Sequence, residues 1–280
     1  MKIEDYDWRM HGVTTITKDL PAEGPGTFFH PAGTPVWPGI AVEWDSQRLV
    51  FGRPSALKVA YDIALTASIE SIDAMDQIQL MPHGNGVMVQ TKCFSNLYNY
   101  FEKYMITIVF SLLTLEILCN FTIGKKLPSN TILLNLEKKP RHYTAEELQK
   151  ANVSLLKKMT IVLPTILKIP SIEESNPQLW KKVKNLIIMR NKITHMTPFD
   201  VFPDISPDKT FLDKESVFAE IINSNPSDAP RYILEVIDYH KKDVLSEKWV
   251  EQMREQYLTR YSHLLEIHDK KNETDRSPRN

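Results

Sequence analysis

Residues 177–195 read PQLWKKVKNLIIMRNKITH. Wound at the helical period, this segment places most of its apolar side chains on one stripe. The stripe consists of Leu179, Val183, Leu186, Ile187, Ile193 and Thr194. Asn176 before Pro177 is typical of a helix start, and Pro198 helps to end the helix. The sequence therefore predicts an amphipathic helix that buries one face against neighbouring helices.

Arg190 lies at the centre of this apolar stripe. A guanidinium does not lose its proton in a protein, and burying it without a partner is costly. A carboxylate, a bound phosphate or a second subunit must therefore neutralise it. Glu116 is the first candidate carboxylate, because it also lies on the apolar face of a hydrophobic helix. The alternative for Glu116 is a partly exposed glutamate near the end of that helix.

His195 follows Arg190 by five residues, and its side chain is the one whose ordinary pKa suits proton transfer near neutral pH. An exposed histidine that interacts with the dipole of a helix C-terminus is the competing interpretation. Five residues also turn a regular helix by about 140° beyond a full turn, so the two side chains do not share one face. Either the last turn unwinds, or the two groups converge only in an assembly.

The hexapeptide Arg190-Asn191-Lys192-Ile193-Thr194-His195 resembles the Arg-x4-6-His motif of the HEPN superfamily, including the polar residue after the arginine. The resemblance covers about residues 54–265. HEPN domains are all-α bundles, and many are metal-independent ribonucleases of toxin–antitoxin and antiviral defence systems. The resemblance implies a homodimer, in which two motifs face each other across a two-fold axis.

The resemblance also implies roles for individual residues. His195 would act as general base or acid while the RNA 2′-hydroxyl attacks, and Arg190 would hold the phosphate and stabilise its developing charge. Asn191 would orient the site or bond the phosphate. Thr194 and Glu116 would support the site. The alternative is a non-catalytic HEPN-like module that dimerises or binds a nucleotide or a partner protein.

The rest of the chain divides into a β-containing N-terminal segment and a helical remainder. Prolines and glycines break any helix within residues 1–53, and alternation on both sides of Asp45-Ser46 predicts a hairpin over 39–51. We expect residues 86–91 to add a strand to that hairpin. Further helices are expected over 55–81, 97–121, 144–163 (with a kink at Pro164), 227–240 and 246–267. A loop rich in proline and aspartate is expected over 197–210.

These segments predict a mainly α protein built as an antiparallel helical bundle with a small N-terminal β-containing segment, and the resemblance of the motif implies that this bundle is HEPN-like. Residues 1–92 would pack on the bundle, 93–268 would form the HEPN-like domain, and 269–280 would be a disordered tail. The apolar run 105–119 is shorter than a membrane span and is interrupted by Glu116, so we expect a core helix and no membrane contact.

Composition limits the partners that this chain can bind. The formal net charge is −1, so any RNA contact must come from a local patch. Residues 177–199 contain no acidic residue, and the candidate RNA-binding lysines there are Lys181, Lys184 and Lys192; a solvated lysine face is the alternative. Cys93 and Cys119 have no metal-ligand spacing, and no metal or cofactor is expected. The resemblance implies RNA, a second copy of the chain and an antitoxin or other defence protein as partners.

We also expect a cytoplasmic location, because residues 1–10 are unlike a signal peptide.

Overall fold

The computed structural model describes residues 7–10, 14–19, 21, 31–32, 34–36, 38–84, 86–127, 130–136, 139–150, 153–196, 217–225, 228–240, 245 and 247–275. For residues 14, 15, 35 and 263–275 it describes the backbone alone. The chain is mainly helical and separates into two compact units, Met1–Asp62 and Ile63–Asn280. The predicted loop over 197–210 lies outside the described residues.

The N-terminal unit contains two small antiparallel pairs of strands. β1 (Thr14–Thr15) pairs with β2 (Pro35–Val36), and β3 (Gly39–Trp44) pairs with β4 (Gln47–Gly52). The turn between β3 and β4 has positive φ at both Asp45 and Ser46, which matches the twist of a two-residue hairpin. The hairpin predicted over 39–51 is thus confirmed.

The predicted third strand pairs elsewhere. β6 (Gly86–Val89) joins β5 (Leu80–His83), and neither bonds to β3 or β4, so the expected pairing with the first hairpin is wrong. Gly84 has a φ of 54°, and the left-handed turn that it permits folds the chain back on the residues just before it. The partner of β6 is therefore the strand that precedes it in sequence, and not the hairpin formed by residues 39–52. β7 (Thr131–Leu134) and β8 (Arg141–Thr144) form a further antiparallel pair.

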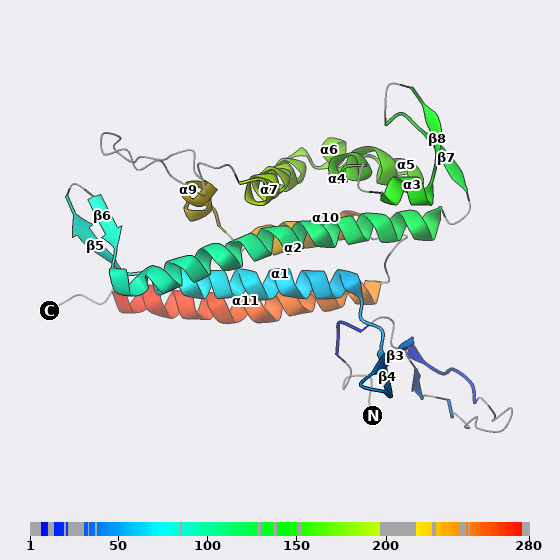
Figure 1. Ribbon diagram of the computed structural model, residues 1–280, viewed down its shortest axis with the longest axis horizontal. Helices are drawn as coiled ribbons and strands as arrows, with labels where there is room; N and C mark the ends of the chain where they lie inside the picture. Colours follow the sequence, from blue (N-terminus) through cyan, green and yellow to red (C-terminus); the bar gives the residue numbers. More distant parts are fainter. Residues whose placement is uncertain are drawn as a thin grey trace. The chain divides into compact units, whose positions relative to one another are not determined.

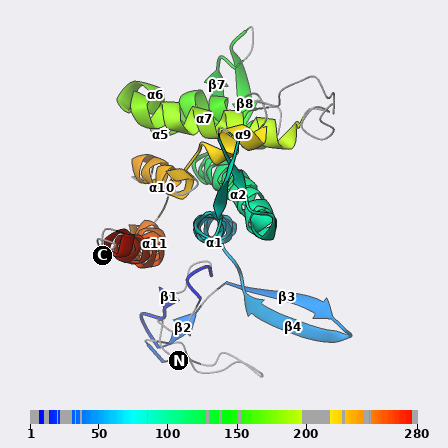
Figure 2. The ribbon, with the colours of Figure 1, turned by 90° about the vertical axis from the view of Figure 1, so that its left-hand side faces the viewer.

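Three long helices dominate the second unit. α1 (Ala56–Asp76), whose first residues belong to the N-terminal unit, runs beside α2 (Phe94–Lys126) in the opposite direction (Figures 1 and 2). α11 (Glu247–Asp275) flanks α1, and the hydroxyls of Ser68 on α1 and Tyr261 on α11 are hydrogen-bonded. α11 therefore continues eight residues beyond Ile267, where sequence placed the end of this helix.

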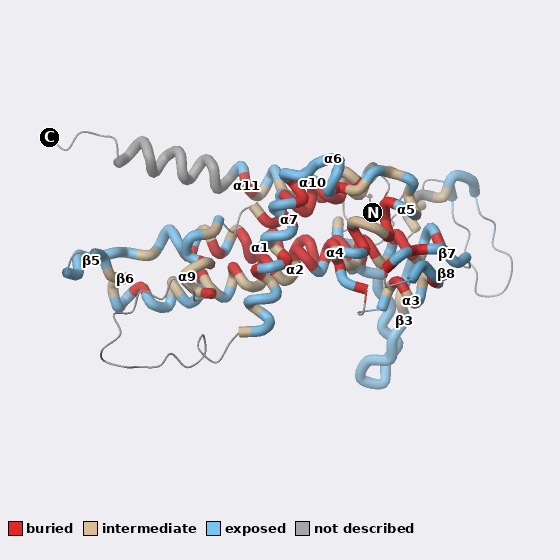
Figure 3. Tube along the Cα trace, turned by 90° about the horizontal axis from the view of Figure 1, so that it is seen from above, coloured by how far each residue is buried: buried red, intermediate tan, exposed pale blue. Residues whose placement is uncertain are grey.

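Shorter elements complete the second unit. They are η2 (Thr91–Cys93), α3 (Ala145–Gln149), α4 (Leu155–Lys157), the π-helix η3 (Lys158–Val162), α5 (Leu163–Leu167), α6 (Ile172–Ser175), α7 (Pro177–Thr194), α9 (Val217–Ile222) and α10 (Asp228–His240). α7 and α10 pack on α2 and on each other. Buried residues are concentrated along these helices, while β5 and β6 are largely exposed (Figure 3).

α2 provides the centre of this core. Ile108, Leu115 and Ile123 are buried on it, and hydroxyls on the same helix donate to carbonyls four residues earlier. These bonds, made by Thr107, Thr114 and Thr122, satisfy polar groups that the packing removes from water. α2 is longer than the predicted 97–121 and is long and apolar enough to cross a membrane by length and composition alone. Just over half of its most apolar window, 56%, is buried inside the protein.

The segment 144–163 is not the single helix that the apolar spacing predicts. Thr144 and Glu147 form the expected capping box, but α3 ends at Gln149 and Lys150 adopts an extended backbone. The chain becomes helical again at Leu155 and passes through the π-helix before Pro164 enters the first turn of α5. The helical backbone is continuous from Leu155 to Leu167, and the π-helical turn comes directly before Pro164, while the break in the predicted helix lies earlier, after Gln149.

The start of α7 allows a test of its capping. The Asn176 side chain accepts a hydrogen bond of 3.1 Å from the amide of Leu179, which satisfies one of the free amides of the first turn. Asn176→Ala should lower the free energy of unfolding by about 1 kcal/mol. The matched control is Asn185→Ala on the exposed face of the same helix, where alanine should be neutral or slightly stabilising. Urea unfolding of both variants measures the difference, and equal midpoints would contradict the cap.

Candidate functional site

The motif residues occupy the last turn of α7 and the residue after it. α7 ends at Thr194, and His195 follows as its C-cap, with its amide donating to the Asn191 carbonyl at 3.0 Å. The Thr194 hydroxyl donates to the Arg190 carbonyl at 2.9 Å. The last turn is therefore regular and closed, and it does not unwind to bring Arg190 and His195 onto one face.

The buried stripe of α7 is largely as predicted. Leu179, Val183 and Ile187 are buried, whereas Leu186 and Ile193 are half-buried and Thr194 is exposed. Arg190 is half-buried at the end of this stripe. Its Nε atom is removed from water and has no hydrogen-bond partner among the described residues. The prediction that Arg190 is not free in solvent is confirmed, but no carboxylate among the described residues pairs with it.

Arg190 lines a pocket of about 630 Å³, which we call the Arg190 pocket. The walls come from α2, from Gln149 and residues 153–156, and from the last turns of α7. The lining residues are Val109, Leu112, Leu113, Glu116, Gln149, Val153, Ser154, Leu155, Leu156, Ile187, Arg190, Asn191 and Thr194. The pocket thus joins one guanidinium, one carboxylate and several amide and hydroxyl groups to an apolar wall.

Glu116 lines the same pocket but is paired with Lys158, and the expected Glu116–Arg190 ion pair is wrong. Lys158 lies on the π-helix and is completely buried. Its ammonium group donates to the Glu116 carboxylate and also to the Asn120 side-chain oxygen at 2.9 Å. The carboxylate therefore neutralises a deeply buried lysine, which needs it more than the half-buried arginine does.

Sequence reasoning missed Lys158. It falls between Leu155 and Met159, inside the apolar pattern of a segment that was expected to be one regular helix. The π-helix adds a residue to the turn and thereby changes which side chains face α2. The sequence did contain a signal, because Lys158 is surrounded by the apolar residues Leu155, Met159 and Val162. All three are buried in the structure.

His195 does not line the Arg190 pocket, and it is exposed. Asn191 and Thr194 do line it. Of the three predicted RNA-binding lysines, Lys192 is ion-paired with Glu220 on α9, while Lys181 and Lys184 are exposed on α7. The structure thus brings together Arg190, Asn191, Thr194 and Glu116, and leaves His195 outside the pocket.

Cys119, on α2, does not line the Arg190 pocket. Burial, with a smaller contribution from the Glu116 carboxylate, raises the pKa of the Cys119 thiol far above its usual range, so Cys119 is not a nucleophile at neutral pH. Among the residues that the structure describes, no three His, Cys, Asp or Glu side chains are grouped as a metal site would require.

Comparison of the chain with protein families, curated proteins and solved structures found no match.

Proposed function

We propose that this chain is a HEPN-like, metal-independent endoribonuclease whose helices form an antiparallel bundle of the HEPN type. The observation that carries the proposal is the state of Arg190, which lines a pocket and has a buried Nε with no partner in the part of the chain that the structure describes. A guanidinium in this state has unused donors that match the oxygens of a phosphate. Asn191 and Thr194 on the same wall offer further polar contacts to such a group.

In the proposed reaction the RNA 2′-hydroxyl attacks the adjacent phosphorus. The new 2′-oxygen–phosphorus bond forms as the bond to the 5′-oxygen breaks, which gives a 2′,3′-cyclic phosphate and a 5′-hydroxyl. His195 takes the proton from the 2′-hydroxyl or gives one to the leaving oxygen. Arg190 stabilises the charge that develops on the phosphate oxygens. The lysines Lys181 and Lys184, exposed on the same helix, offer a positive path for the rest of the RNA.

A homodimer is part of this proposal. His195 is exposed and off the pocket wall, so within one chain it lacks a direct route to a phosphate held by Arg190. A two-fold assembly through the end of α7 supplies the histidine of one copy to the arginine of the other. We also propose a cytoplasmic location and a role in antiviral defence or in a toxin–antitoxin pair, with an antitoxin or other defence protein as partner; these rest on the resemblance of the motif.

The second candidate is a non-catalytic HEPN-like module that dimerises or binds a nucleotide or partner protein. One observation favours it: the proton-transfer group stands outside the pocket that holds the cation. An arginine pocket without a nearby histidine binds an anion and does not cleave it.

Incubating the purified protein with total RNA, with and without EDTA, separates the two candidates. The nuclease should fragment RNA equally in both conditions and leave 2′,3′-cyclic phosphate ends, because no metal takes part in the proposed step. The ends are identified by mass spectrometry before and after acid hydrolysis. Intact RNA after prolonged incubation at micromolar protein would favour the binding module, and cleavage lost in EDTA would contradict the proposed mechanism.

A further inference from the structure

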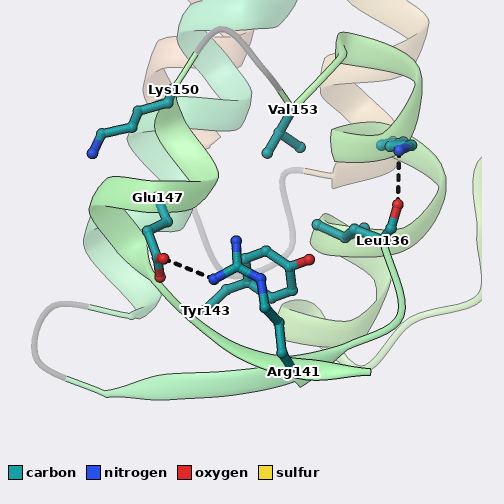
Figure 4. Close-up of a pocket in the computed structure, with 7 residues that line it drawn as sticks. Leu136, Arg141, Tyr143, Glu147, Lys150 and Val153 are labelled. Carbon is teal, nitrogen blue, oxygen red and sulfur yellow. Dashed lines mark hydrogen bonds and ion pairs between the residues drawn. The ribbon is translucent and has the colours of Figure 1, made fainter. Parts of the chain in front are cut away.

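A second pocket, of about 170 Å³, lies in the second unit between the β7–β8 pair, α3 and the segment 153–157. Its lining residues are Leu136, Arg141, Tyr143, Glu147, Lys150, Val153 and Lys157. Figure 4 shows Arg141 and Tyr143 on one side of this space, with Lys150 and Val153 on the opposite side. Val153 also lines the Arg190 pocket, so the two pockets share a wall.

The lining carries a positive excess. The lining contains three cationic side chains, Arg141, Lys150 and Lys157, and one carboxylate, that of Glu147. Glu147 is already engaged: it accepts 2.8 Å and 2.9 Å hydrogen bonds from the Thr144 amide and the Arg141 guanidinium. These bonds, the Thr144 amide first, lower the pKa of Glu147, which keeps it ionised at neutral pH. Among the described lining residues, cationic side chains therefore outnumber carboxylates by three to one.

Two of the cationic side chains, Arg141 and Lys157, are held in place before any ligand binds. The Arg141 guanidinium lies 4.1 Å from the centre of the Tyr143 ring, and its salt bridge to Glu147 fixes its orientation (Figure 4). The Lys157 ammonium donates to the Leu136 carbonyl at 2.7 Å, which uses one of its three protons. Positioned donors lose little freedom when a ligand binds.

Two groups in the pocket lack a strong partner. The Tyr143 hydroxyl is removed from water, no described residue forms a hydrogen bond of good geometry with it, and the Arg141 guanidinium lies over the ring face. Tyr143 itself is 2% exposed. Among the described residues, the ion-pair partner of Lys150 is Glu146, at 3.3 Å, and both of these side chains are well exposed to solvent. An exposed ion pair of this kind contributes little to stability, so Lys150 can leave Glu146 and contact a ligand with a small loss of free energy.

We propose that this pocket binds the terminal phosphate of a phosphorylated ligand. A phosphate monoester carries close to two negative charges near neutral pH, which suits a lining in which cationic side chains outnumber carboxylates. The volume is smaller than that of pockets that enclose a whole drug-sized ligand, roughly 300 Å³ or more. The pocket therefore encloses a phosphate group and leaves the remainder of its ligand outside. This inference does not depend on cleavage at the Arg190 pocket.

Calorimetric titration of the full-length protein tests the proposal with matched probes. These are adenosine 5′-monophosphate against adenosine, inorganic phosphate, and a short RNA with a 5′-phosphate against the same RNA with a 5′-hydroxyl. Each phosphorylated probe that binds should lose affinity about tenfold or more in Lys150→Gln and in Lys157→Gln, since each removes a charge-assisted contact. Lys248→Gln, which changes an exposed lysine on α11, should leave this binding unchanged.

The probes also identify the source of the phosphate. Inorganic phosphate binding as tightly as the nucleotide would make free phosphate the ligand, whereas tighter binding of the nucleotide or of the 5′-phosphorylated RNA would make it the end of a larger molecule. Both outcomes support the site. Binding that Arg190→Gln abolishes while Lys150→Gln and Lys157→Gln preserve it would assign the phosphate to the other pocket and overturn the proposal. Absence of saturable binding by all three phosphate probes at millimolar concentration would overturn it as well.

Discussion

Arg190→Ala and His195→Ala should each reduce RNA cleavage by about 10²–10⁴-fold. Arg190 offers donors to the phosphate oxygens from within the pocket, and nothing among the described lining replaces that charge. His195 supplies the proton-transfer group, and its exposed position means that its removal costs little packing. The measurement is the initial rate of cleavage of a fluorescently labelled RNA at equal protein concentration.

Folding controls make this result interpretable. His195→Ala should unfold at the wild-type urea concentration, because an exposed C-cap imidazole makes few contacts. Arg190→Ala should also stay folded, because Arg190 has no ion pair among the described residues and its removal leaves no buried carboxylate behind. Asn185→Ala, on the exposed face of α7, should cleave RNA at the wild-type rate. A folded His195→Ala protein with wild-type activity would remove the proton-transfer role and favour the binding module.

Mixing the two inactive variants tests the assembly directly. If the site combines the arginine of one subunit with the histidine of the other, subunit exchange creates mixed dimers that hold one intact combination. Random exchange makes about half of the dimers mixed, and one of two combinations in each is intact, so activity should return to about a quarter of wild type. Mixtures as inactive as their components would contradict a composite site, and so would an active monomer in light scattering.

Much of the helical framework was predictable because it depends on local patterns. The apolar stripe and Asn176-Pro177 located α7, and Thr144 and Glu147 located the start of α3, since spacing and capping groups lie within a few residues of each other. The Asp45-Ser46 turn located the first hairpin for the same reason. Each of these features is set by neighbouring residues and needs no knowledge of the tertiary structure.

The partners of charged residues were harder to predict because they depend on contacts distant in sequence. Glu116 and Arg190 were correctly expected on one surface, yet the sequence does not show that the π-helix turns Lys158 toward α2. A charge on an apolar face signals that a partner exists, but three-dimensional packing selects which one. The pocket at Arg141 escaped prediction in a similar way, because its lining depends on β7 and β8, which the sequence pattern did not indicate.

Because Lys158 is paired with Glu116, replacing either residue should lower the free energy of unfolding, but by unequal amounts. Glu116→Gln should lower the free energy of unfolding by about 3–5 kcal/mol, because it leaves an ammonium group in the core without a counter-charge. Lys158 is fully buried, and its remaining acceptors are neutral oxygens of Asn120 and Gln149. Lys158→Met should lower the free energy of unfolding by clearly less than Glu116→Gln does. The Glu116 side chain is 33% exposed and lines a pocket, so water can solvate it, and methionine fills most of the lysine's volume with apolar atoms.

The double variant Glu116→Gln/Lys158→Met separates this explanation from a general loss of packing. It removes both charges, so it should be more stable than Glu116→Gln alone, and the two effects should be strongly non-additive. Urea unfolding of the four proteins gives the coupling free energy, with Glu146→Gln as the control for an exposed glutamate on α3 that should change stability by less than about 1 kcal/mol. Equal costs for the two single variants, or a double variant as unstable as their sum, would mean that the buried ammonium does not require the Glu116 carboxylate. The predicted order instead follows from burial: of two paired charges, the one without access to water depends more on the other.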